Sequence, residues 1–287
     1  MREITLEALL KEGKRYLRKY DVPQSPLDAE LLLMQVLDIT RVEIYTKSKE
    51  SISYERQIEY QELLRKRAQG IPLQYLKGNQ EFMGLSFSVT PDVLIPRPDT
   101  EVLVESVQEY TRKENFQYLA EIGTGSGCIS ISLCYYQPWI HIMAGDISPD
   151  ALRVAEQNGI RHHVQNQIEW IRSDVFQGFP DSMIGKFDAI VSNPPYIPTK
   201  DISTLMREVK DHEPYQALNG GQDGLDFYQR IIQEGHKFLM PNGYFFFEVG
   251  KDQAFPVSEL LEKQGCDRVE IRKDLSGIER VVIGRKY

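Results

Sequence analysis

The sequence predicts an α/β fold, with a mainly parallel sheet, helices on both of its faces, and a small helical domain in front. From residue 117 onward, short apolar runs alternate with helical segments, a pattern typical of βαβ units. The first part of the chain instead repeats apolar side chains every three or four positions, which predicts helices. Only the short segment DLSGIE separates the last two apolar runs. It is too short for a right-handed crossover, so those two strands should be antiparallel.

Three parts of the chain are predicted in order. Residues 1–74 form the helical domain, in which Ser25 with Pro26 favours a helix start, and Gly70 with Pro72 favours a stop. Residues 75–98 are predicted to form a β-hairpin linker, because the pattern changes to short alternating pieces broken by glycine and proline. Residues 99–287 form the sheet domain. Ligands of such sheets bind beyond the carboxyl ends of the strands.

The composition excludes several classes of protein. Of the 287 residues, 41% are hydrophobic and 26% are charged, which is ordinary for a globular chain. No apolar run approaches the roughly 20 residues that span a bilayer, so we expect a soluble, cytoplasmic protein with no membrane partner. The three cysteines have no metal-binding spacing, and we expect neither a disulfide framework nor a metal.

The charge is unevenly distributed along the chain. The first 75 residues carry 13 Lys and Arg against 12 Asp and Glu, whereas the remainder carries 21 against 30. An acidic surface repels a phosphate backbone unless a local basic groove overrides it. No direct nucleic-acid partner is therefore expected.

A glycine-rich strand-to-helix junction lies in AEIGTGSGCIS, residues 120–130. Glycines permit close approach of the backbone to a ligand there, although a tight turn without a ligand would also use them. The dinucleotide fingerprint GxGxxG would need glycine at position 128, where this chain has Cys128. An acid followed by GxGxG resembles instead the first motif of class I methyltransferases, which bind S-adenosylmethionine. The candidate cofactor-binding residues in this segment are Glu121, Gly123, Thr124, Gly125, Ser126 and Gly127.

Two more acids follow the next predicted strands. Asp146 stands 23 residues after Gly123, near the spacing at which an acid accepts hydrogen bonds from ribose hydroxyls. It could instead cap the helix that begins at Ser148. Asp174, followed by Val175, closes the third strand, where a solvated strand end is the alternative. Because the carboxyl ends of parallel strands meet at one edge, these acids and the glycine loop should share one crevice.

The motif Asn193-Pro194-Pro195-Tyr196 ends a fourth strand in the same crevice. Two consecutive prolines remove two N–H donors, so backbone carbonyls beside them lack ladder partners. One such carbonyl and the Asn193 side-chain carbonyl can accept both N–H bonds of a planar NH₂ group, from an amide or an aromatic amine. The Tyr196 ring can stack on that group and lie near a sulfonium cation. A proline-stiffened loop without a ligand is the alternative.

Motifs along nearly the whole chain resemble those of the release-factor glutamine N5-methyltransferases. They include PLQYLKGNQEFMGLSF, LIPRPDTE, EIGTGSGCI, NPPYIP, GGQDGLDFY and DLSGIERVV. NPPY alone also occurs in adenine-N6 and guanine-N2 methyltransferases, whereas LIPRPDTE together with NPPYIP and DGLDFY is much more specific. The resemblance implies a class I S-adenosylmethionine-dependent fold with a seven-stranded sheet, a helical substrate-recognition domain and a hairpin linker. It also implies a substrate, the glutamine in the GGQ loop of bacterial or organellar peptide chain release factors.

The resemblance also implies a role for each matching position. The loop glycines would hold the methionine part of S-adenosylmethionine, Asp146 the ribose, and Asp174 with Val175 the adenine. Many relatives carry a tryptophan directly after the acid of the third strand, where this chain has Val175 followed by Phe176. The glutamine amide would be held by the fourth-strand motif, with Asn193, Pro194 and Tyr196 catalytic and Pro195 beside them, and Asn193 would also contact the cofactor.

Three other functions remain open. An N6-adenine or N2-guanine nucleic-acid methyltransferase would flip a base into the same crevice, and it predicts a basic groove or a recognition insert. A non-catalytic binding protein could retain the cofactor fold, although the intact NPPY and GTGSG motifs argue against it. A nicotinamide oxidoreductase is disfavoured by Cys128 and would leave NPPY without a role.

Overall fold

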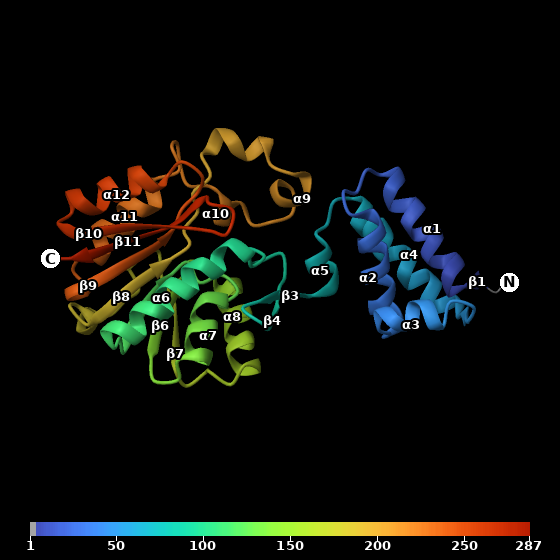
Figure 1. The fold of residues 1–287 in the computed structure, drawn as a ribbon, viewed down its shortest axis with the longest axis horizontal. Helices are drawn as coiled ribbons and strands as arrows, with labels where there is room; N and C mark the ends of the chain where they lie inside the picture. The colour runs from blue at the N-terminus through green and yellow to red at the C-terminus, as the bar shows by residue number, and fades with distance from the viewer. Residues whose placement is uncertain (1–3) are drawn as a thin grey trace. The chain divides into compact units, whose positions relative to one another are not determined.

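A computed structural model describes residues 4–287, and the chain divides into two compact units. One unit runs up to Asn79 and also includes Met206–His212; the other comprises Gln80–Leu205 and Glu213–Tyr287. The division falls inside the predicted linker. In Figure 1 the first unit is coloured blue to teal except for its orange-yellow segment at α9, and the second unit runs from teal to red.

The first unit is helical, as the apolar spacing predicts. Ser25 begins its second helix with Pro26 in the first turn, and Thr40 and Glu43 form a capping box at its third. The core consists mainly of leucines from the longer helices, around the fully buried ring of Tyr60. The elements are β1 (Ile4–Thr5), α1 (Leu6–Lys19), α2 (Ser25–Leu37), α3 (Arg41–Thr46), β2 (Ser51–Ile52), α4 (Tyr54–Ala68), α5 (Leu73–Lys77) and α9 (Arg207–Lys210).

A buried arginine accounts for the short distant segment in this unit. Arg67 of α4 pairs with Asp28 of α2, at 2.7 Å, and with Glu208 of α9, also at 2.7 Å. The Arg67 side chain is only 7% exposed, so its charge requires both carboxylates. Helix α9 is thereby tied to the helical unit, although it lies more than a hundred positions further along the chain.

The second unit contains the predicted sheet. Seven strands lie in the order β10-β11-β9-β8-β5-β6-β7, and the five from β9 to β7 are parallel. Strand β11 is antiparallel to both β9 and β10, which confirms the expectation for the last pair. The strands are β5 (Tyr118–Ile122), β6 (His141–Asp146), β7 (Ile168–Arg172), β8 (Phe187–Ser192), β9 (Leu239–Glu248), β10 (Cys266–Lys273) and β11 (Glu279–Lys286).

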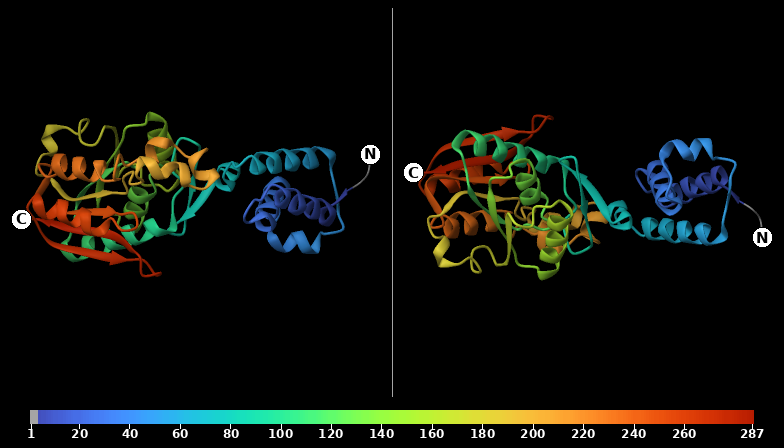
Figure 2. Two further views of the ribbon diagram at one scale, coloured as in Figure 1. Left: turned by 90° about the horizontal axis from the view of Figure 1, so that it is seen from above. Right: turned by 90° about the horizontal axis from the view of Figure 1, so that it is seen from below.

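Helices cover both faces of the sheet, so each face has its own core. Helices α6 and α7 lie on one face and α11 and α12 on the other (Figures 1 and 2), and buried side chains of each pair belong to a separate core. None of the helices described between residues 4 and 287 is long and apolar enough to cross a bilayer. The helices of this unit are η1 (Pro98–Thr100), α6 (Glu101–Glu114), α7 (Cys128–Tyr136), α8 (Pro149–Arg161), η2 (Asp181–Met183), η3 (Thr199–Thr204), α10 (Tyr215–Leu218), α11 (Asp226–Gly235) and α12 (Ala254–Lys263).

A hairpin lies where the linker is predicted. Strands β3 (Asn79–Phe82) and β4 (Leu85–Ser88) form a two-stranded sheet joined by Met83 and Gly84. Both turn residues have positive φ, 50° and 72°, as a two-residue hairpin turn requires. Helix α5 extends to Lys77, so the first residues of the predicted linker are helical.

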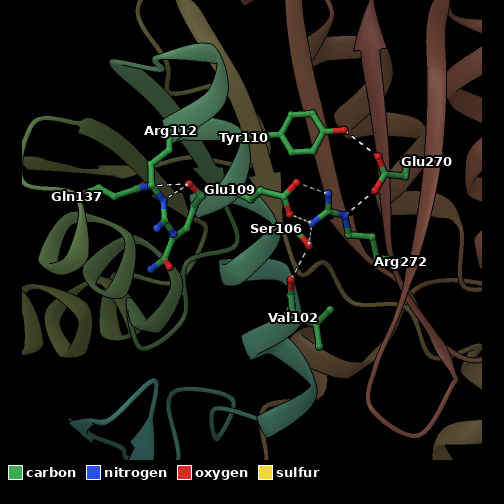
Figure 3. Close-up of polar contacts among 9 residues, drawn as sticks. Val102, Ser106, Glu109, Tyr110, Arg112, Gln137, Glu270 and Arg272 are labelled. Atoms are coloured by element: carbon green, nitrogen blue, oxygen red, sulfur yellow. Dashed lines mark hydrogen bonds and ion pairs between the residues drawn. The ribbon is translucent and has the colours of Figure 1, made fainter.

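A polar network fixes α6 against the edge strand β10 (Figure 3). Arg272 forms two hydrogen bonds with Glu109, at 2.6 and 3.2 Å, and its Nε donates to Glu270 at 2.6 Å. Tyr110 donates to the same Glu270 at 2.9 Å, and the Arg272 guanidinium lies over its ring. Since α6 begins directly after η1, this network also helps to hold Thr100, which reappears at the site below.

Candidate active site

A cavity of about 490 Å³ opens at the carboxyl ends of β5, β6, β7 and β8. Its position agrees with the rule that open α/β sheets bind ligands beyond these strand ends. The volume lies within the range of roughly 300–1,000 Å³ that is typical of small-molecule sites. Residues predicted from the sequence that line it are Gly123, Gly125, Asp146, Asp174, Val175, Asn193, Pro194 and Pro195.

The three loop glycines have two different tasks. Gly123 and Gly125 line the cavity with φ of 75° and 55°, and a Cβ on either would meet nothing within 4 Å. Gly127 is the N-cap residue of α7 with φ of 80°, and a Cβ there would stand 2.9 Å from the Ile131 side chain and 3.1 Å from Trp170. Only the first two therefore leave room for a ligand. The third permits α7 to pack closely, and the prediction that it also holds the methionine part finds no support here.

Glu121 lies beneath the loop and does not line the cavity. Its carboxylate accepts a hydrogen bond from the Thr124 hydroxyl at 2.8 Å and another from the Ser130 hydroxyl. Burial raises the pKa of this carboxyl to about 7, against those hydrogen bonds, which lower it. Thr124 and Ser126 are also buried and are not among the described residues that line the cavity. The placement of these three residues favours a role in holding the loop in shape. It does not favour the direct contact with the cofactor that was predicted from the sequence.

Asp146 lies at the end of β6 with its carboxylate at the cavity. One oxygen accepts from the Gly125 N–H at 2.8 Å, and the other accepts from the Ser148 N–H at 2.9 Å. The helix cap considered as an alternative for Asp146 is made instead by Ser148, whose hydroxyl accepts from the Ala151 N–H. Burial raises the pKa of Asp146, while these backbone donors oppose the shift. The carboxylate thus clamps the glycine loop and still lines the cavity.

Asp174 and Val175 line the cavity beyond β7. Asp174 pairs with Arg230 of α11 at 2.9 Å, a partner that the sequence did not indicate. Val175 is buried and has φ of 52°, a costly conformation for a β-branched residue. The Ser173 hydroxyl donates to the Val175 carbonyl at 2.7 Å, which helps to maintain this turn. Such strain is typical of functional sites when the surrounding structure enforces it.

The NPPY motif contributes three residues to the cavity wall and turns the fourth away. The Asn193 side-chain nitrogen donates to the Thr100 hydroxyl at 3.2 Å, and Pro194 and Pro195 follow along the wall. Tyr196 is not among the described lining residues; its ring lies beside Gly250. Burial raises the pKa of its hydroxyl to about 12. The predicted stacking of Tyr196 on the reacting group is therefore not supported by this placement.

The LIPRPDTE motif makes three separate connections around the site. Arg97 pairs with Glu213 at 2.5 Å, and Glu213 lies in sequence just before the α10 residues that line the cavity. Asp99 pairs with Arg280 of β11 at 2.8 Å. Thr100 accepts from Asn193. A motif that served only as a family signature in the sequence thus supports the NPPY strand end, the sheet and the α10 loop.

Several lining residues were missed by reasoning from the sequence. Asp92 and Leu94 were assigned to a linker. Ile147 was not considered because the prediction used only Asp146, the acid that precedes it. The position of Ile147 directly after a strand-end acid is the one signal that could have identified it. Tyr215 lies on the short helix α10 and Phe227 in the first turn of α11, and no motif in the sequence marks either position as part of the site.

The residues of the cavity fit S-adenosylmethionine. Gly123 and Gly125 leave open space at the backbone, which suits close approach of an amino-acid group. Asp146 offers a carboxylate to hydroxyl donors, and Leu94, Ile147 and Val175 offer apolar walls for a base. Among residues 4–287 no cluster of three or more His, Cys, Asp or Glu could hold a metal ion.

The sheet order, the glycine loop and the strand-end acids together define a class I S-adenosylmethionine-dependent methyltransferase. Residues 8–78 match the family described as PrmC N-terminal domain, and residues 98–211 match the methyltransferase small domain. The catalytic domain of hMettl16, solved in complex with MAT2A 3′UTR hairpin 6, has a TM-score of 0.58 at 16% identity and covers 83% of this chain and 85% of its own. This likeness shows the fold alone.

Curated relatives narrow the class to one family. The release factor glutamine methyltransferase of Clostridium acetobutylicum is 40% identical over 256 residues, covering 89% of this chain and 90% of that protein. The protein of the same name from Koribacter versatilis is 38% identical and covers 99% of both chains. The chain belongs to the release factor glutamine methyltransferase family.

Proposed function

We propose that this methyltransferase transfers a methyl group from S-adenosylmethionine to the side-chain amide nitrogen, N5, of the glutamine in the GGQ motif of peptide chain release factors. The observation that carries the proposal is the orientation of Asn193. Its side-chain nitrogen donates a hydrogen bond to the Thr100 hydroxyl at 3.2 Å, which leaves its carbonyl oxygen for the cavity. A carbonyl in that position accepts a hydrogen bond from an NH₂ group.

The substrate amide would be held by two acceptors. Strand β8 ends its ladder at Ser192, and the prolines that follow have no N–H, so the Pro194 carbonyl lies beyond the paired part of the sheet. Asn193 and this carbonyl would each take one N–H of the glutamine. Both bonds orient the amide nitrogen and increase the electron density on it.

An amide nitrogen is a poor nucleophile because its lone pair is delocalised. S-adenosylmethionine supplies a methyl group activated by its sulfonium charge. The protein's part is to hold the nitrogen in line with that methyl group, and aligned intramolecular reactions reach effective molarities of roughly 10⁵–10⁸ M, about 7–11 kcal/mol of barrier. The methylated nitrogen is acidic, so its proton can leave to water without a strong base.

For the cofactor, we assign Gly123 and Gly125 to the methionine part and Asp146 to the ribose hydroxyls. Asp174 and Val175, with Ile147, would surround the adenine. The carboxylate of Asp174 is already paired with Arg230, so its contribution to the adenine would depend on the lone pairs that remain. Glu121 would act indirectly, by bracing the loop.

The helical unit would recognise the release factor. It carries a second hollow of about 490 Å³ between α1 and α4, with Leu9, Tyr16 and Leu64 among its walls. Three cations, Arg15, Lys19 and Arg65, stand around it against one acid, Glu12. A hollow with this charge balance suits an acidic, partly apolar segment of a protein partner.

The activity is tested with labelled S-adenosylmethionine and an intact release factor, beside the same factor with the GGQ glutamine changed to alanine. Label should enter only the unchanged factor. Single-stranded DNA and RNA containing adenine and guanine form the third arm. Incorporation into nucleic acid but not into the factor would favour the amine-methylating alternative instead.

Recognition by the helical unit is tested with Arg15→Glu and Lys19→Glu together. Both residues are remote in sequence from the methyl-transfer site, so kcat should remain, whereas KM for the intact factor should rise. A short GGQ peptide should show no change, because it lacks any segment that could reach the hollow. An unchanged KM for the intact factor would remove the hollow from recognition.

A further inference from the structure

The side-chain amide of Asn193 has two orientations, related by a half-turn about its last bond. With the carbonyl toward the cavity, it accepts hydrogen bonds from an NH₂ group; with the nitrogen toward the cavity, it donates to a carbonyl or carboxylate. The choice between them decides which chemical group the site accepts. Residues that hold one orientation therefore affect both turnover and specificity.

Two buried residues stand behind this amide. Strands β8 and β9 are parallel, and Ser192 pairs with Phe247. The next residues, Asn193 and Glu248, therefore lie side by side at the carboxyl ends of these two strands. Thr100 adjoins both: its hydroxyl accepts from the Asn193 nitrogen at 3.2 Å, and it lies near enough to the Glu248 carboxyl to lower the pKa of that group. Thr100 is 2% exposed and Glu248 is 1% exposed.

We propose that Thr100 and Glu248 are positioning residues that hold the Asn193 amide with its nitrogen toward the protein and its carbonyl toward the substrate. The physical reason is the direction of the hydrogen bonds. An ionised carboxylate only accepts, so the single Thr100 proton is directed to Glu248. The Thr100 oxygen can then only accept, and of the two ends of the Asn193 amide only the nitrogen can donate to it.

The surroundings of Glu248 support a functional role for its carboxyl. One of its oxygens, Oε2, has no hydrogen-bond partner among the described residues, an arrangement that costs stability and that an apolar side chain would avoid. Burial raises the pKa of Glu248 to about 7, while hydrogen bonds from Thr100 and Asn193 lower it. The titratable and charged groups that face it are Arg280 of β11, Asp99 of η1, Tyr196, Tyr228 of α11 and Cys128 of α7.

A protonated Glu248 can donate a hydrogen bond to the Thr100 oxygen. The hydrogen bond between Thr100 and Asn193 can then run in the opposite direction, from the hydroxyl to the amide. The Thr100 proton would then be free to point at Asn193, whose amide could turn its carbonyl inward. Turnover should consequently rise with pH as Glu248 ionises. This inference rests on the proposed function, because it assigns the substrate group as an amide NH₂.

The matched variants are Thr100→Val, which keeps the shape but removes the hydroxyl, and Thr100→Ser, which keeps the hydroxyl. Single-turnover transfer to a release factor should fall about 10- to 100-fold in Thr100→Val, by analogy with outer partners of metal ligands. KM for S-adenosylmethionine should not change, and Thr100→Ser should stay within a few-fold of the wild type. Equal losses in both variants, or none in Thr100→Val, would overturn the role of Thr100.

Two further measurements separate positioning from mere support. A release factor with glutamate in place of the GGQ glutamine should inhibit Thr100→Val more strongly than the wild type, because a turned amide donates to a carboxylate. Unchanged inhibition counts against the proposal. Glu248→Gln should remove the rise of kcat with pH around 7, and a profile identical to that of the wild type would exclude Glu248 from the relay.

A readout without substrate distinguishes this inference from the proposed function. In NMR spectra, the side-chain NH₂ protons of Asn193 should exchange slowly with solvent in the wild type and in Thr100→Ser, and faster in Thr100→Val. If no release factor is methylated, the proposed function fails, and the exchange rates still judge the relay. Rapid exchange in the wild type, or equal rates in all three proteins, would refute it.

Discussion

Arg97 and Glu213, 116 positions apart in the chain, form an ion pair with a nitrogen-to-oxygen distance of 2.5 Å. The Glu213 side chain is 1% exposed, whereas that of Arg97 is 35% exposed. The pair joins the segment that carries Thr100 to the start of α10, whose residues line the cavity. The arrangement of one cavity wall therefore depends on a buried carboxylate that needs a cation.

Removing the cation should destabilise the protein more than removing both charges. Arg97→Ala removes a cation that pairs with the buried Glu213 carboxylate, and because Arg97 is itself partly exposed we expect a loss of less than the roughly 3–5 kcal/mol that breaking a fully buried pair costs in the free energy of unfolding. The double variant Arg97→Ala with Glu213→Gln should recover part of that loss. Urea unfolding measures both. Equal stability of the single and double variants would show that the ion pair is not what holds this loop.

Asp146 should be needed for cofactor binding. Asp146→Ala removes a half-buried acceptor that lines the cavity, and we expect a loss of about 1–3 kcal/mol in S-adenosylmethionine affinity. The matched control is Asp188→Ala, because Asp188 also accepts two backbone N–H bonds, from Gln117 and Tyr118, at the opposite end of the sheet. Calorimetry should show normal affinity in the control. Similar affinities in both folded variants would contradict the assignment.

Gly123 and Gly265 provide a test of the ligand space. Both have positive φ, 75° and 84°, and a Cβ on either meets nothing within 4 Å. Alanine should therefore cost each site a similar amount of stability, about 1–2 kcal/mol for the left-handed conformation. Only Gly123→Ala should weaken S-adenosylmethionine binding, because only Gly123 lines the cavity. A loss of affinity in Gly265→Ala of the same size would mean that the effect is one of stability.

Asn193 should act on turnover and not on cofactor binding. Asn193→Ala removes one acceptor for the substrate amide, and loss of a single well-placed hydrogen-bonding group typically costs about 10²–10³ in rate. Asn219→Ala is the control: Asn219 lines the same cavity, but its carbonyl already accepts from Thr199 and Gly221. Single-turnover methylation at saturating cofactor measures both. Wild-type transfer by Asn193→Ala would disprove the amide clamp.

Asn193→Asp gives complementary information on the same acceptor. Aspartate keeps an oxygen of similar size and adds a negative charge, which an aromatic amine would tolerate. We expect slower methylation of the glutamine amide than in the wild type, with cofactor affinity retained. Faster transfer to an aromatic amine than to the release factor would point to the nucleic-acid alternative.

The stability of the protein should fall as the pH rises from about 5 to 8. Glu121 and Glu248 have pKa values near 7, raised by burial from the usual 4.5. Between those values the folded protein holds more protons than the unfolded chain, so the free energy of unfolding decreases with increasing pH. One pKa unit corresponds to about 1.4 kcal/mol, so each group contributes up to about 3 kcal/mol. Urea unfolding at several pH values gives the free energy of unfolding as a function of pH. Its decrease between pH 5 and 8 should be smaller in Glu248→Gln than in the wild type, and an identical decrease would contradict the raised pKa of Glu248.

The local features of this protein follow from its sequence. The alternation of apolar runs and helices predicts the parallel sheet, and the short DLSGIE segment predicts the antiparallel final pair, because the chain is too short to cross over. Gly123, Asp146 and Asn193 are identified for the same reason: parallel strands align their carboxyl ends, so strand-end residues meet.

Other features depended on tertiary packing. Gly123 and Gly127 belong to one motif, yet one faces the cavity and the other is confined by Ile131 and Trp170. No spacing rule separates them, because the difference comes from the neighbours that α7 meets. Tyr196 follows the prolines in sequence, but its ring turns to Gly250, away from the reacting position that its motif suggested.

The sequence by itself determined the order of strands and helices along the chain, the family, and the carboxyl ends of the strands as the place where the chemistry occurs. These features depend on local periodicity and on chain connections. Only the tertiary structure brought Thr100 and Glu248 to Asn193 and paired Arg97 with Glu213. These contacts join segments about 50 to 120 residues apart, and the pairing of a particular hydroxyl or charge across such a separation is set by the packing of the elements between them. The polar groups that orient the site could therefore not be assigned before the fold was known.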